Sequence, residues 1–445
     1  MTGCPRSVVN LNSWLDKITA LHPREIELGL ERIRHVADAM GLNRPAPLVV
    51  TVAGTNGKGS CVACLEAIFT AAGFRVGSYT SPHLHVFNER VVIAGDPVDD
   101  QSLCDAFQVV EEARGEVSLT YFEFATLAAL WIFQSDTLDV ALLEVGLGGR
   151  LDAVNIIDPD VAVITSIELD HMDWLGPDRE AIGAEKAGIL RAGSPAVCGD
   201  PRPPRSVLQR AAQLQVDLRV VSRDFRWLVQ GGTETTRSAA DQCLWTWAGK
   251  NRGGESVELS GLPPTPLGLD NVAAALQVVK LLPLKVDTQT LKDALGDIFL
   301  PGRMETMSRP GHGGRVILDV AHNPAAAARL AERLRSIRAG MQPGGRVITV
   351  FAMMADKDIN GFYQALESLV DIWYIAQVAE ARCMPSSSLV QLLAGKNAVM
   401  YPEPFDDAVT AFEIAVRNAS PQDVILVTGS FYTVASVREQ LLVTQ

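Results

Sequence analysis

A glycine-rich segment carries one lysine and one hydroxyl, the residue types that hold the phosphates of a nucleotide. It runs Gly54-Thr55-Asn56-Gly57-Lys58-Gly59-Ser60 and follows an apolar run, Leu48–Ala53, that is typical of a buried strand. A helical pattern comes next, so we expect the backbone N–H groups of the turn and the positive end of the helix to face phosphate. The lysine can reach the outer phosphates and the hydroxyl can serve Mg²⁺. The segment therefore predicts binding of a nucleoside triphosphate.

The spacing of this segment narrows the class of nucleotide-binding protein. In the widespread phosphate loop, G-x-x-x-x-G-K-[ST], four residues separate the glycines and the hydroxyl follows the lysine directly. Here Gly54 and Gly57 are only three positions apart, and Gly59 separates Lys58 from Ser60. This shortened form resembles the loop of the amide-bond ligases of the Mur family, not that of kinases or GTPases.

Three further residues could bind a divalent cation. Glu144 ends an apolar run, and a carboxylate at a strand end near a phosphate loop is a natural Mg²⁺ ligand, although a solvated or salt-bridged strand end would give the same pattern. His171 follows a strand between two acids, and its type and position leave a metal ligand and a structural histidine equally open. Lys186 lies in a helical pattern that by itself favours a surface lysine.

A polar cluster also follows a strand near residue 319, in the order Asp319-Val320-Ala321-His322-Asn323-Pro324. It would place two or three polar side chains at a cleft. Proline favours the first turn of a helix, so we expect a helix to begin near Pro324. Asn323 could simply cap that helix, and such a cap could coexist with a site.

Apolar and helical runs alternate through the first part of the chain. The strands are almost continuously apolar, as expected where both faces of a parallel sheet are buried. This alternation predicts an α/β class with a doubly wound, P-loop-type domain, whose ligands lie beyond the carboxyl ends of the strands. The predicted strands of this domain are Leu48–Ala53, Phe74–Tyr79, Val140–Val145 and Val161–Ile167.

The character of the sequence changes twice further along. Val220–Pro266 predicts a small antiparallel β patch and Leu269–Leu282 a helix, while Gly311–Gly314 resembles an insertion in a turn. Leu300-Pro301-Gly302-Arg303 predicts a joint between domains, so we expect domains at 1–298 and 299–445. The second domain is predicted to be Rossmann-like and lacks the G-x-G-x-x-G of dinucleotide sites. Its predicted strands are Arg315–Val320, Arg346–Phe351, Asp371–Val378 and Asp423–Thr428.

Composition limits the partners. A chain of 445 residues has room for two or three domains, and its net charge of −13 argues against nucleic acid and anionic membranes as partners. No apolar run reaches the ~20 residues that a membrane span needs, and Met1–Pro23 lacks the apolar core of a signal peptide. The seven scattered cysteines favour reduced thiols. We therefore expect a cytoplasmic protein, and a monomer.

Taken together, these segments resemble the folylpolyglutamate synthase family of the Mur ligase superfamily, in its bacterial form that also makes dihydrofolate. The resemblance covers nearly the whole chain, and the ordered set of motifs is far more specific than any one of them. The matching segments are Leu28–Ile33, Gly54–Ser60, Ser81–Leu84, Glu89-Arg90, Thr120–Phe124, Leu143–Asp152, Leu169–Gly176, Glu185–Ile189, Pro301–Arg303, Asp319–Pro324, Asp356–Asp358 and Gly429–Phe431.

The resemblance implies an ATP-dependent amide ligase. It would add L-glutamate to dihydropteroate and to reduced folates through an acyl phosphate. It implies two Mg²⁺ ions, one held by Ser81 and Glu144 and one by His171 and a carbamylated Lys186, whose anionic oxygens would suit Mg²⁺. The other implied contacts are Asn271, Arg303 and Asp319 with ATP, His322 and Ser430 with glutamate, and Thr120, Tyr121, Phe122, Glu123, Leu151, Asp152 and Ala153 with the pterin substrate.

Two other functions remain open on the sequence. A peptidoglycan-precursor ligase of the same superfamily would need a nucleotide-sugar pocket ahead of the phosphate loop, and only about 47 residues precede the first strand. A nucleotide-binding protein without ligase turnover would bind or hydrolyse ATP independently of a pterin acid and glutamate.

Overall fold

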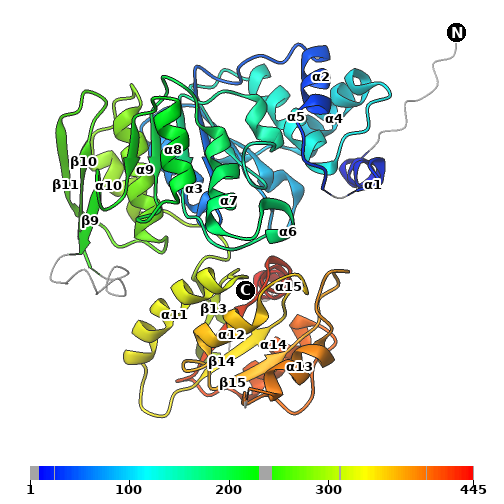
Figure 1. The fold of residues 1–445 in the computed structure, drawn as a ribbon. Coiled ribbons are helices and arrows are strands. Elements are labelled where there is room, and N and C mark those ends of the chain that lie inside the picture. Colours follow the sequence, from blue (N-terminus) through cyan, green and yellow to red (C-terminus); the bar gives the residue numbers. More distant parts are fainter. Residues whose placement is uncertain (1–9, 25, 230–242, 310–311, 397, 444–445) are drawn as a thin grey trace, which may run out of the picture. The chain divides into compact units, whose positions relative to one another are not determined.

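The computed structural model describes residues 10–24, 26–229, 243–309, 312–396 and 398–443 (Figure 1). The chain divides into two compact units. One contains the sequence up to Leu228, Trp245–Pro263 and Gly268–Ile298, and the other contains most of the remainder, from Phe299 onward. Each unit combines a sheet with helices, which confirms the predicted α/β class.

The first unit is built on an eight-stranded sheet in the order β4-β3-β2-β5-β1-β6-β7-β8. The six strands from β2 to β8 in this order are parallel. At one edge β3 pairs antiparallel with β2, and β4 pairs antiparallel with β3. Because β5 and β6 flank the central β1, the strand order reverses there, as in a doubly wound fold. The strands are β1 (Leu48–Ala53), β2 (Val76–Tyr79), β3 (Val91–Ile93), β4 (Asp96–Pro97), β5 (Val140–Glu144), β6 (Val161–Ile164), β7 (Ala196–Cys198) and β8 (Leu218–Val220).

Many helices of this unit begin at a side chain that caps them. Asp99 accepts from the backbone N–H of Ser102 at the start of α4, and Asp178 does the same for Ala181 at the start of α7. The helices are α1 (Leu11–Leu21), α2 (Glu31–Ala39), α3 (Lys58–Ala71), α4 (Asp100–Arg114), α5 (Tyr121–Ser135), α6 (Met172–Leu175), α7 (Arg179–Lys186), α8 (Arg205–Gln213), α9 (Leu269–Leu281) and α10 (Thr288–Gly296), with short 3₁₀ turns η1 (Phe87–Arg90), η2 (Ala153–Ile156) and η3 (Ala187–Ile189).

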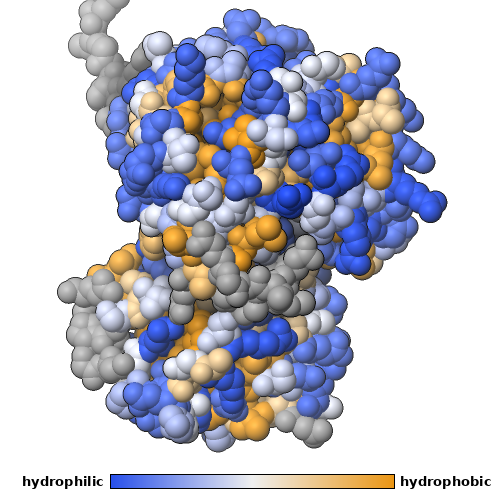
Figure 2. Space-filling model, turned by 90° about the vertical axis from the view of Figure 1, so that its left-hand side faces the viewer, coloured by the Kyte–Doolittle hydropathy of each residue, from blue (hydrophilic) through white to orange (hydrophobic). Residues whose placement is uncertain are grey.

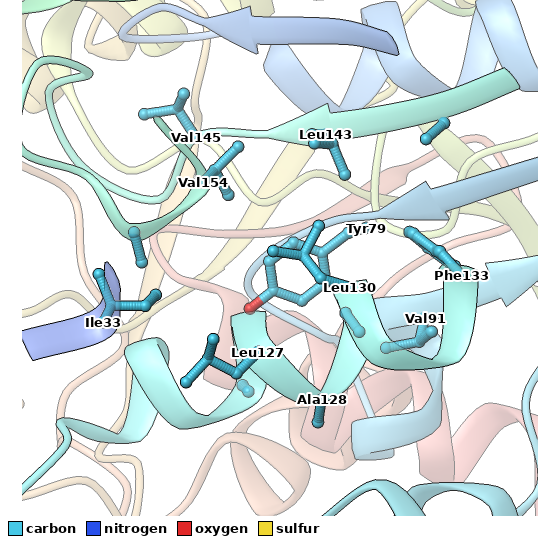
Figure 3. Packing of buried hydrophobic residues seen from close by; sticks show 14 of the residues in the cluster. Ile33, Tyr79, Val91, Leu127, Ala128, Leu130, Phe133, Leu143, Val145 and Val154 are labelled. Atoms are coloured by element: carbon cyan, nitrogen blue, oxygen red, sulfur yellow. The ribbon is translucent and has the colours of Figure 1, made fainter. Parts of the chain in front are cut away.

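The core of the first unit explains why its strands are apolar at every position. Leu143 of β5 joins the cluster that also buries α5, whereas its neighbour Leu142, on the opposite face of the strand, is equally buried. Figure 3 shows this cluster, with Leu127 and Leu130 of α5 beside Tyr79 of β2. Burial on both faces therefore holds β5 and its neighbours in the middle of the unit.

A separate three-stranded sheet, β11-β10-β9, lies within the region predicted as a β patch. Its strands are β9 (Arg226–Val229), β10 (Trp245–Lys250) and β11 (Ser256–Leu262), and β10 pairs antiparallel with β11. Two buried tryptophans on β10 anchor it, since Trp245 Nε1 donates to the Pro263 carbonyl and Trp247 Nε1 to the Ala273 carbonyl. Residues 230–242 of the predicted patch lie outside the described residues.

The second unit has a five-stranded sheet in the order β12-β13-β16-β14-β15, parallel except for β12 at one edge. The predicted turn insertion at Gly311–Gly314 is wrong for His312–Gly314, which belong to β13, because pairing with β12 outweighs the low strand preference of glycine. The elements are β12 (Glu305–Arg309), β13 (His312–Leu318), α11 (Pro324–Ala339), β14 (Val347–Phe351), α12 (Ile359–Leu366), β15 (Ile372–Ile375), α13 (Ser386–Ala394), α14 (Ala408–Asn418), β16 (Val424–Thr428) and α15 (Phe431–Val443).

The surface in Figure 2 is a mosaic in which hydrophilic residues are interspersed with smaller hydrophobic areas. Among the helices of the described segments, none combines the length and the apolar character that a membrane crossing requires.

Candidate active site

The phosphate loop leaves β1 at Gly54 and enters α3 at Lys58, at the centre of the first sheet. Gly54 has φ of 153° and Gly57 has φ of 87°. A β-carbon at Gly54 would stand 1.8 Å from Thr165 Oγ1, and one at Gly57 would stand 2.2 Å from Asn271 Oδ1. Both positions therefore need glycine, and Asn271 of α9 lies against the loop, as expected of a residue near the nucleotide.

Hydroxyl side chains at the end of β6 hold the loop in place. The Thr55 N–H donates to the Ser166 carbonyl (2.7 Å), the Asn56 N–H donates to Ser166 Oγ (3.1 Å), and Thr165 Oγ1 donates to the Asn56 carbonyl (2.8 Å). The expectation that the whole turn directs its N–H groups at phosphate is wrong for Thr55 and Asn56, because Ser166 takes both.

The N–H groups that suit a phosphate come from the first turn of α3. The first intrahelical bond runs from the Cys61 N–H to the Gly57 carbonyl (2.9 Å), so the preceding amides of Lys58, Gly59 and Ser60 have no acceptor within the helix. Lys58 Nζ donates to the Gly54 carbonyl (3.2 Å), which keeps its ammonium over the loop, and Ser60 is buried. The helix start therefore presents a positive cradle.

Glu144 lies beside this cradle. It is the last residue of β5 and pairs in register with Val52 of β1, which brings its carboxylate to the strand end next to the loop. Glu144 Oε2 accepts the Ser81 N–H (3.2 Å) and lies 3.7 Å from the point where a β-carbon of Gly59 would stand. The structure thus brings together Ser81, Glu144 and the loop, as predicted.

Lys186 is buried, with 2% of its surface exposed, so the helical pattern that favoured a surface lysine was misleading. Burial, and then repulsion by Lys58, lower the pKa of its ammonium to about 7, while the charges of Asp170 and Asp152 oppose that shift. These causes place Lys186, Lys58, Asp170 and Asp152 within electrostatic reach of one another. A lysine with such a pKa has a large neutral fraction near pH 7.

His171 begins α6 in a left-handed conformation, with φ of 51°. Its N–H donates to Asp170 Oδ1 (2.9 Å), and the same oxygen lies 4.0 Å from His171 Nε2. The sequence pattern does not indicate a role for Asp170, which the structure connects both to His171 and, through its charge, to Lys186. An acid beside a histidine is too common in sequences to have identified it.

The glycine-rich turn after β5 positions both Lys186 and Asp152. A β-carbon at Gly149 would stand 3.2 Å from the Lys186 Cα, so glycine permits this close approach. The Asp152 carboxylate accepts N–H groups from Leu147 (2.8 Å) and Val154 (3.0 Å), and its burial raises its pKa to about 6 despite these bonds. The remaining predicted residues of this turn are half-buried or buried, namely Leu151 and Ala153.

The predicted pterin segment forms the start of α5. Thr120 and Glu123 make a capping box, in which Glu123 Oε2 accepts from the Thr120 N–H (2.8 Å) while Thr120 Oγ1 accepts from the Glu123 N–H (3.2 Å). The Tyr121 ring contacts the Arg90 guanidinium. The Phe122 ring packs against Gly146, because a β-carbon at Gly146 would stand only 2.6 Å from that ring. Phe122 therefore covers the turn that follows Glu144.

Three predicted residues of the second unit, Asp319, His322 and Ser430, follow the carboxyl ends of its strands, and Arg303 precedes β12, which runs antiparallel to β13. Asp319 accepts the N–H groups of Met304 (3.0 Å) and Ala321 (3.0 Å), and burial raises its pKa while the nearby Arg303 lowers it. The Arg303 guanidinium lies 5.0 Å from the centre of the Phe431 ring. Arg303 and Asp319 therefore lie close enough for their charges to interact.

His322 and Ser430 lie near the same ring. The His322 and Phe431 ring centres are 5.8 Å apart, and His322 Nδ1 lies 2.9 Å from the Val320 carbonyl. Ser430 is buried, and its Oγ accepts the Thr433 N–H (3.0 Å). His322 and Ser430, the two residues predicted to contact the substrate L-glutamate, therefore lie at the start of α15.

A buried ion pair that the sequence pattern does not indicate supports the loop that carries Arg303. Arg438 Nε lies 2.9 Å from Glu305 Oε2, which also accepts the Gly302 N–H (2.8 Å). Glu305 and Arg438 are 133 positions apart, so no local pattern could have shown that they meet.

The donor groups fit magnesium. No cluster of three or more His, Cys, Asp or Glu side chains suited to a metal occurs in the described part of the chain. Ser81 and Glu144 meet at the phosphate loop, and oxygen donors in small number are typical of Mg²⁺ sites that share the ion with substrate phosphates and water. The arrangement therefore suits ions that arrive with a nucleotide.

A helix-start phosphate cradle at the centre of a doubly wound sheet, beside a lone carboxylate and a buried lysine, defines an ATP-dependent ligase of the Mur type. Two family descriptions match, "Mur ligase middle domain" over residues 52–198 and "Mur ligase, glutamate ligase domain" over residues 302–431. The dihydrofolate synthase/folylpolyglutamate synthase of Escherichia coli (strain K12) is 42% identical over 435 residues, which cover 98% of this chain and 96% of that protein. This chain therefore belongs to the dihydrofolate synthase/folylpolyglutamate synthase family.

Solved structures agree with this assignment over the full chain. E. coli FolC in complex with DHPP and ADP has a TM-score of 0.89 at 41% identity and covers 99% of both chains. A bifunctional folylpolyglutamate synthase/dihydrofolate synthase from Yersinia pestis, complexed with AMPPNP and Mn, has a TM-score of 0.87 at 43% identity, covering 99% of this chain and 100% of that chain. A structure of a protein of the same name holds Mn, AMPPNP and L-glutamate, with the same scores.

Proposed function

We propose that this protein is an ATP-dependent carbon–nitrogen ligase that adds L-glutamate to dihydropteroate, giving dihydrofolate, and to reduced folates, giving polyglutamates. The observation that carries the proposal is the meeting of the phosphate loop, Glu144 and the buried Lys186 at one edge of the first sheet. The relatives named above, whose structures hold ADP, AMPPNP, Mn, DHPP and L-glutamate, support the same reaction.

The reaction needs activation because a carboxylate does not react with an amine at neutral pH. The substrate carboxylate attacks the γ-phosphorus of ATP, which breaks the bond to the β-phosphate oxygen and gives an acyl phosphate and ADP. The α-amine of glutamate then attacks the acyl carbon, loses a proton, and expels inorganic phosphate to leave an amide. Lys58 and the first-turn amides of α3 hold the phosphate oxygens and offset their charge.

Two Mg²⁺ ions would supply the positive charge that phosphoryl transfer requires. We assign Ser81 and Glu144 to one ion, and His171 and Lys186 to the other. Ser81 and Glu144 already touch each other and lie beside the loop. The Mn in a related structure with AMPPNP supports the use of a divalent ion.

Lys186 serves this role as a carbamate. An ammonium would repel Mg²⁺, whereas a neutral amine that adds to the carbon of CO₂ and releases one proton to water becomes a carbamate with anionic oxygens. Its pKa of about 7 leaves roughly half of the amine neutral at pH 7. Asp170 and Asp152 are close enough to influence its charge and would hold the carbamate's surroundings in a fixed geometry.

The remaining substrates are assigned as follows. We place ATP against Asn271, Arg303 and Asp319, glutamate against His322 and Ser430, and the pterin acid against the starts of α5 and η2. The last two elements contribute Thr120, Tyr121, Phe122 and Glu123, and Leu151, Asp152 and Ala153. The protein would act as a monomer in the cytoplasm, in keeping with the free cysteines of its described residues.

ADP release with defined substrates tests this function. We expect turnover only when ATP, Mg²⁺, L-glutamate and either dihydropteroate or tetrahydrofolate are all present. Turnover with a UDP-linked peptidoglycan precursor in place of the pterin acid would favour a peptidoglycan ligase. ADP release that is indifferent to both the acid and glutamate would favour a nucleotide-binding protein without ligase activity. Turnover with only one of the two pterin substrates would restrict the proposal to that activity.

A further inference from the structure

Arg90 is a buried cation close to the candidate site. Only 9% of its surface is exposed, and it ends η1, directly before β3. Its guanidinium carbon lies 5.5 Å from the centre of the Phe87 ring and 5.4 Å from that of Tyr121. Its Nε donates to His83 Nδ1 (2.9 Å). Within the described residues, no carboxylate forms an ion pair with it.

The neighbours of Arg90 do not neutralise its charge. Arg90 Nε donates to His83 Nδ1, and an imidazole nitrogen that accepts a hydrogen bond carries no proton, so His83 is a neutral acceptor. The adjacent Glu89 carboxylate accepts the N–H groups of Leu84 (2.6 Å), His85 (2.8 Å) and Val86 (2.9 Å) instead. Burying a charge without a directly paired partner is costly, which indicates that an anion belongs there.

The position of Arg90 identifies the anion. The Arg90 carbonyl accepts the Thr80 N–H (2.9 Å). Ser81, which follows Thr80 in the chain, donates its backbone N–H to Glu144 beside the phosphate loop. On its other side Arg90 contacts Tyr121, within the segment assigned to the pterin. Arg90 thus lies between the site of phosphoryl transfer and the pterin segment, where the acid group of dihydropteroate has to be.

We propose that the Arg90 guanidinium binds the carboxylate of dihydropteroate and orients it for phosphorylation, an inference that rests on the proposed function. With Nε bonded to His83 and two rings against the guanidinium, the two terminal nitrogens remain as donors. Such a fork matches the two oxygens of a carboxylate. Phe87 and Tyr121 fix the plane of the guanidinium, so the bound carboxylate has one preferred orientation.

Paired binding measurements without nucleotide separate this role from a structural one. Calorimetry would compare dihydropteroate with an analogue in which hydrogen replaces the carboxyl group, for the wild type and for Arg90→Met. We expect the wild type to prefer the acid by at least about tenfold. Arg90→Met should lose most of that preference and bind the analogue as the wild type does. Its melting temperature without substrate should stay the same or rise, because an unpaired buried charge is gone.

Steady-state kinetics give a second readout. Arg90→Met should raise the KM for dihydropteroate and leave the KM for ATP unchanged, and Arg90→Lys, which keeps the charge without the fork, should retain part of the preference. Arg75→Met, which removes a cation paired with Asp136 on the surface of the same unit, is the matched control and should keep the full preference.

Retained preference for the acid in Arg90→Met would overturn the inference. If Arg90→Met does not fold, Arg90→Lys decides, and a wild-type preference in that variant overturns the inference as well. Wild-type protein that releases no ADP with dihydropteroate and glutamate would instead contradict the proposed function, so the two failures can be told apart.

Discussion

The Asn271 amide lies directly against Gly57, with its oxygen, nitrogen and carbon 2.2 to 2.5 Å from the point where a β-carbon would stand. Gly57→Ala must therefore displace Asn271 as well as strain the backbone, since φ is 87°. We expect the affinity for ATP to fall by at least about tenfold, measured by calorimetry.

Gly73→Ala is the matched control for this substitution. Gly73 has a nearly identical φ of 85° and nothing within 4 Å of its β-carbon position. The control should lose about 1 kcal/mol of stability and bind ATP normally. Equal ATP affinities in the two variants would show that the contact with Asn271 is unimportant.

Glu144→Gln keeps the shape of the side chain but removes the charge proposed to hold Mg²⁺. We expect the Mg²⁺ concentration for half-maximal activity to rise by about 10- to 100-fold, as is usual when a metal's surroundings are altered. Glu66→Gln is the control, because Glu66 is a half-buried carboxylate of the same unit that accepts a hydrogen bond from Ser78 Oγ (2.8 Å). An unchanged Mg²⁺ requirement in Glu144→Gln would remove Glu144 from the metal site.

Lys186→Met should reduce turnover by at least about 100-fold, because the proposed second ion loses its anionic ligand. Added acetate or propionate should restore part of the activity by standing in for the carbamate. Wild-type activity should fall in CO₂-free buffer and recover with bicarbonate. Lys280→Met is the control, since burial also lowers the pKa of Lys280. Full activity of Lys186→Met without a carboxylate would exclude the ligand role.

The same variant makes a stability prediction with a defined sign. The Lys186 pKa is about 7 in the folded protein and 10.5 as a model value, so between these limits the unfolded chain binds more protons. The free energy of unfolding of the wild type therefore rises with pH between these two values. Below pH 7 the buried ammonium of Lys186 destabilises the folded protein to its full extent. Lys186→Met should be more stable than the wild type below pH 7, by at most about 5 kcal/mol, with the gain lost by pH 10.5. Chemical denaturation at several pH values measures it.

Arg438→Met should disturb ATP use without touching the nucleotide. Glu305, which pairs with Arg438, accepts the backbone N–H of Gly302. Because Arg303 follows Gly302 directly, the ion pair helps to position Arg303. A small displacement of Arg303 should raise the KM for ATP roughly tenfold. Arg346→Met, which breaks the comparable pair with the buried Asp423 in the same unit, should lose stability but keep its KM. A similar KM for both variants would mean that the pair serves only folding.

The sequence predicted those features that depend on local pattern. Leu48–Ala53 matches β1 residue for residue, because a strand buried on both faces has to be apolar throughout. Glu144 was identifiable because a lone carboxylate at the end of such a strand is conspicuous. The predicted strand Val161–Ile167 instead ends at Ile164, because Thr165 and Ser166 turn aside to bind the phosphate loop.

Features that depend on distant contacts could not be predicted. Lys186 looks like a surface lysine because it lies in a helical pattern directly after Glu185. Its burial depends on Gly149, which lets another turn pack onto its Cα. The unpaired charge of Arg90 is likewise invisible in sequence, because Glu89 stands next to it and only the structure shows that this acid bonds to backbone N–H groups.

The bonds from Thr55 and Asn56 to Ser166 have a consequence for the energetics of nucleotide capture. These bonds hold the turn without a ligand, so we expect that ATP does not have to order a flexible segment when it binds. Such preorganisation means that a larger share of the attraction between phosphates and protein appears as affinity. A Ser166→Gly change should accordingly weaken ATP binding through entropy, even though Ser166 itself need never touch the nucleotide.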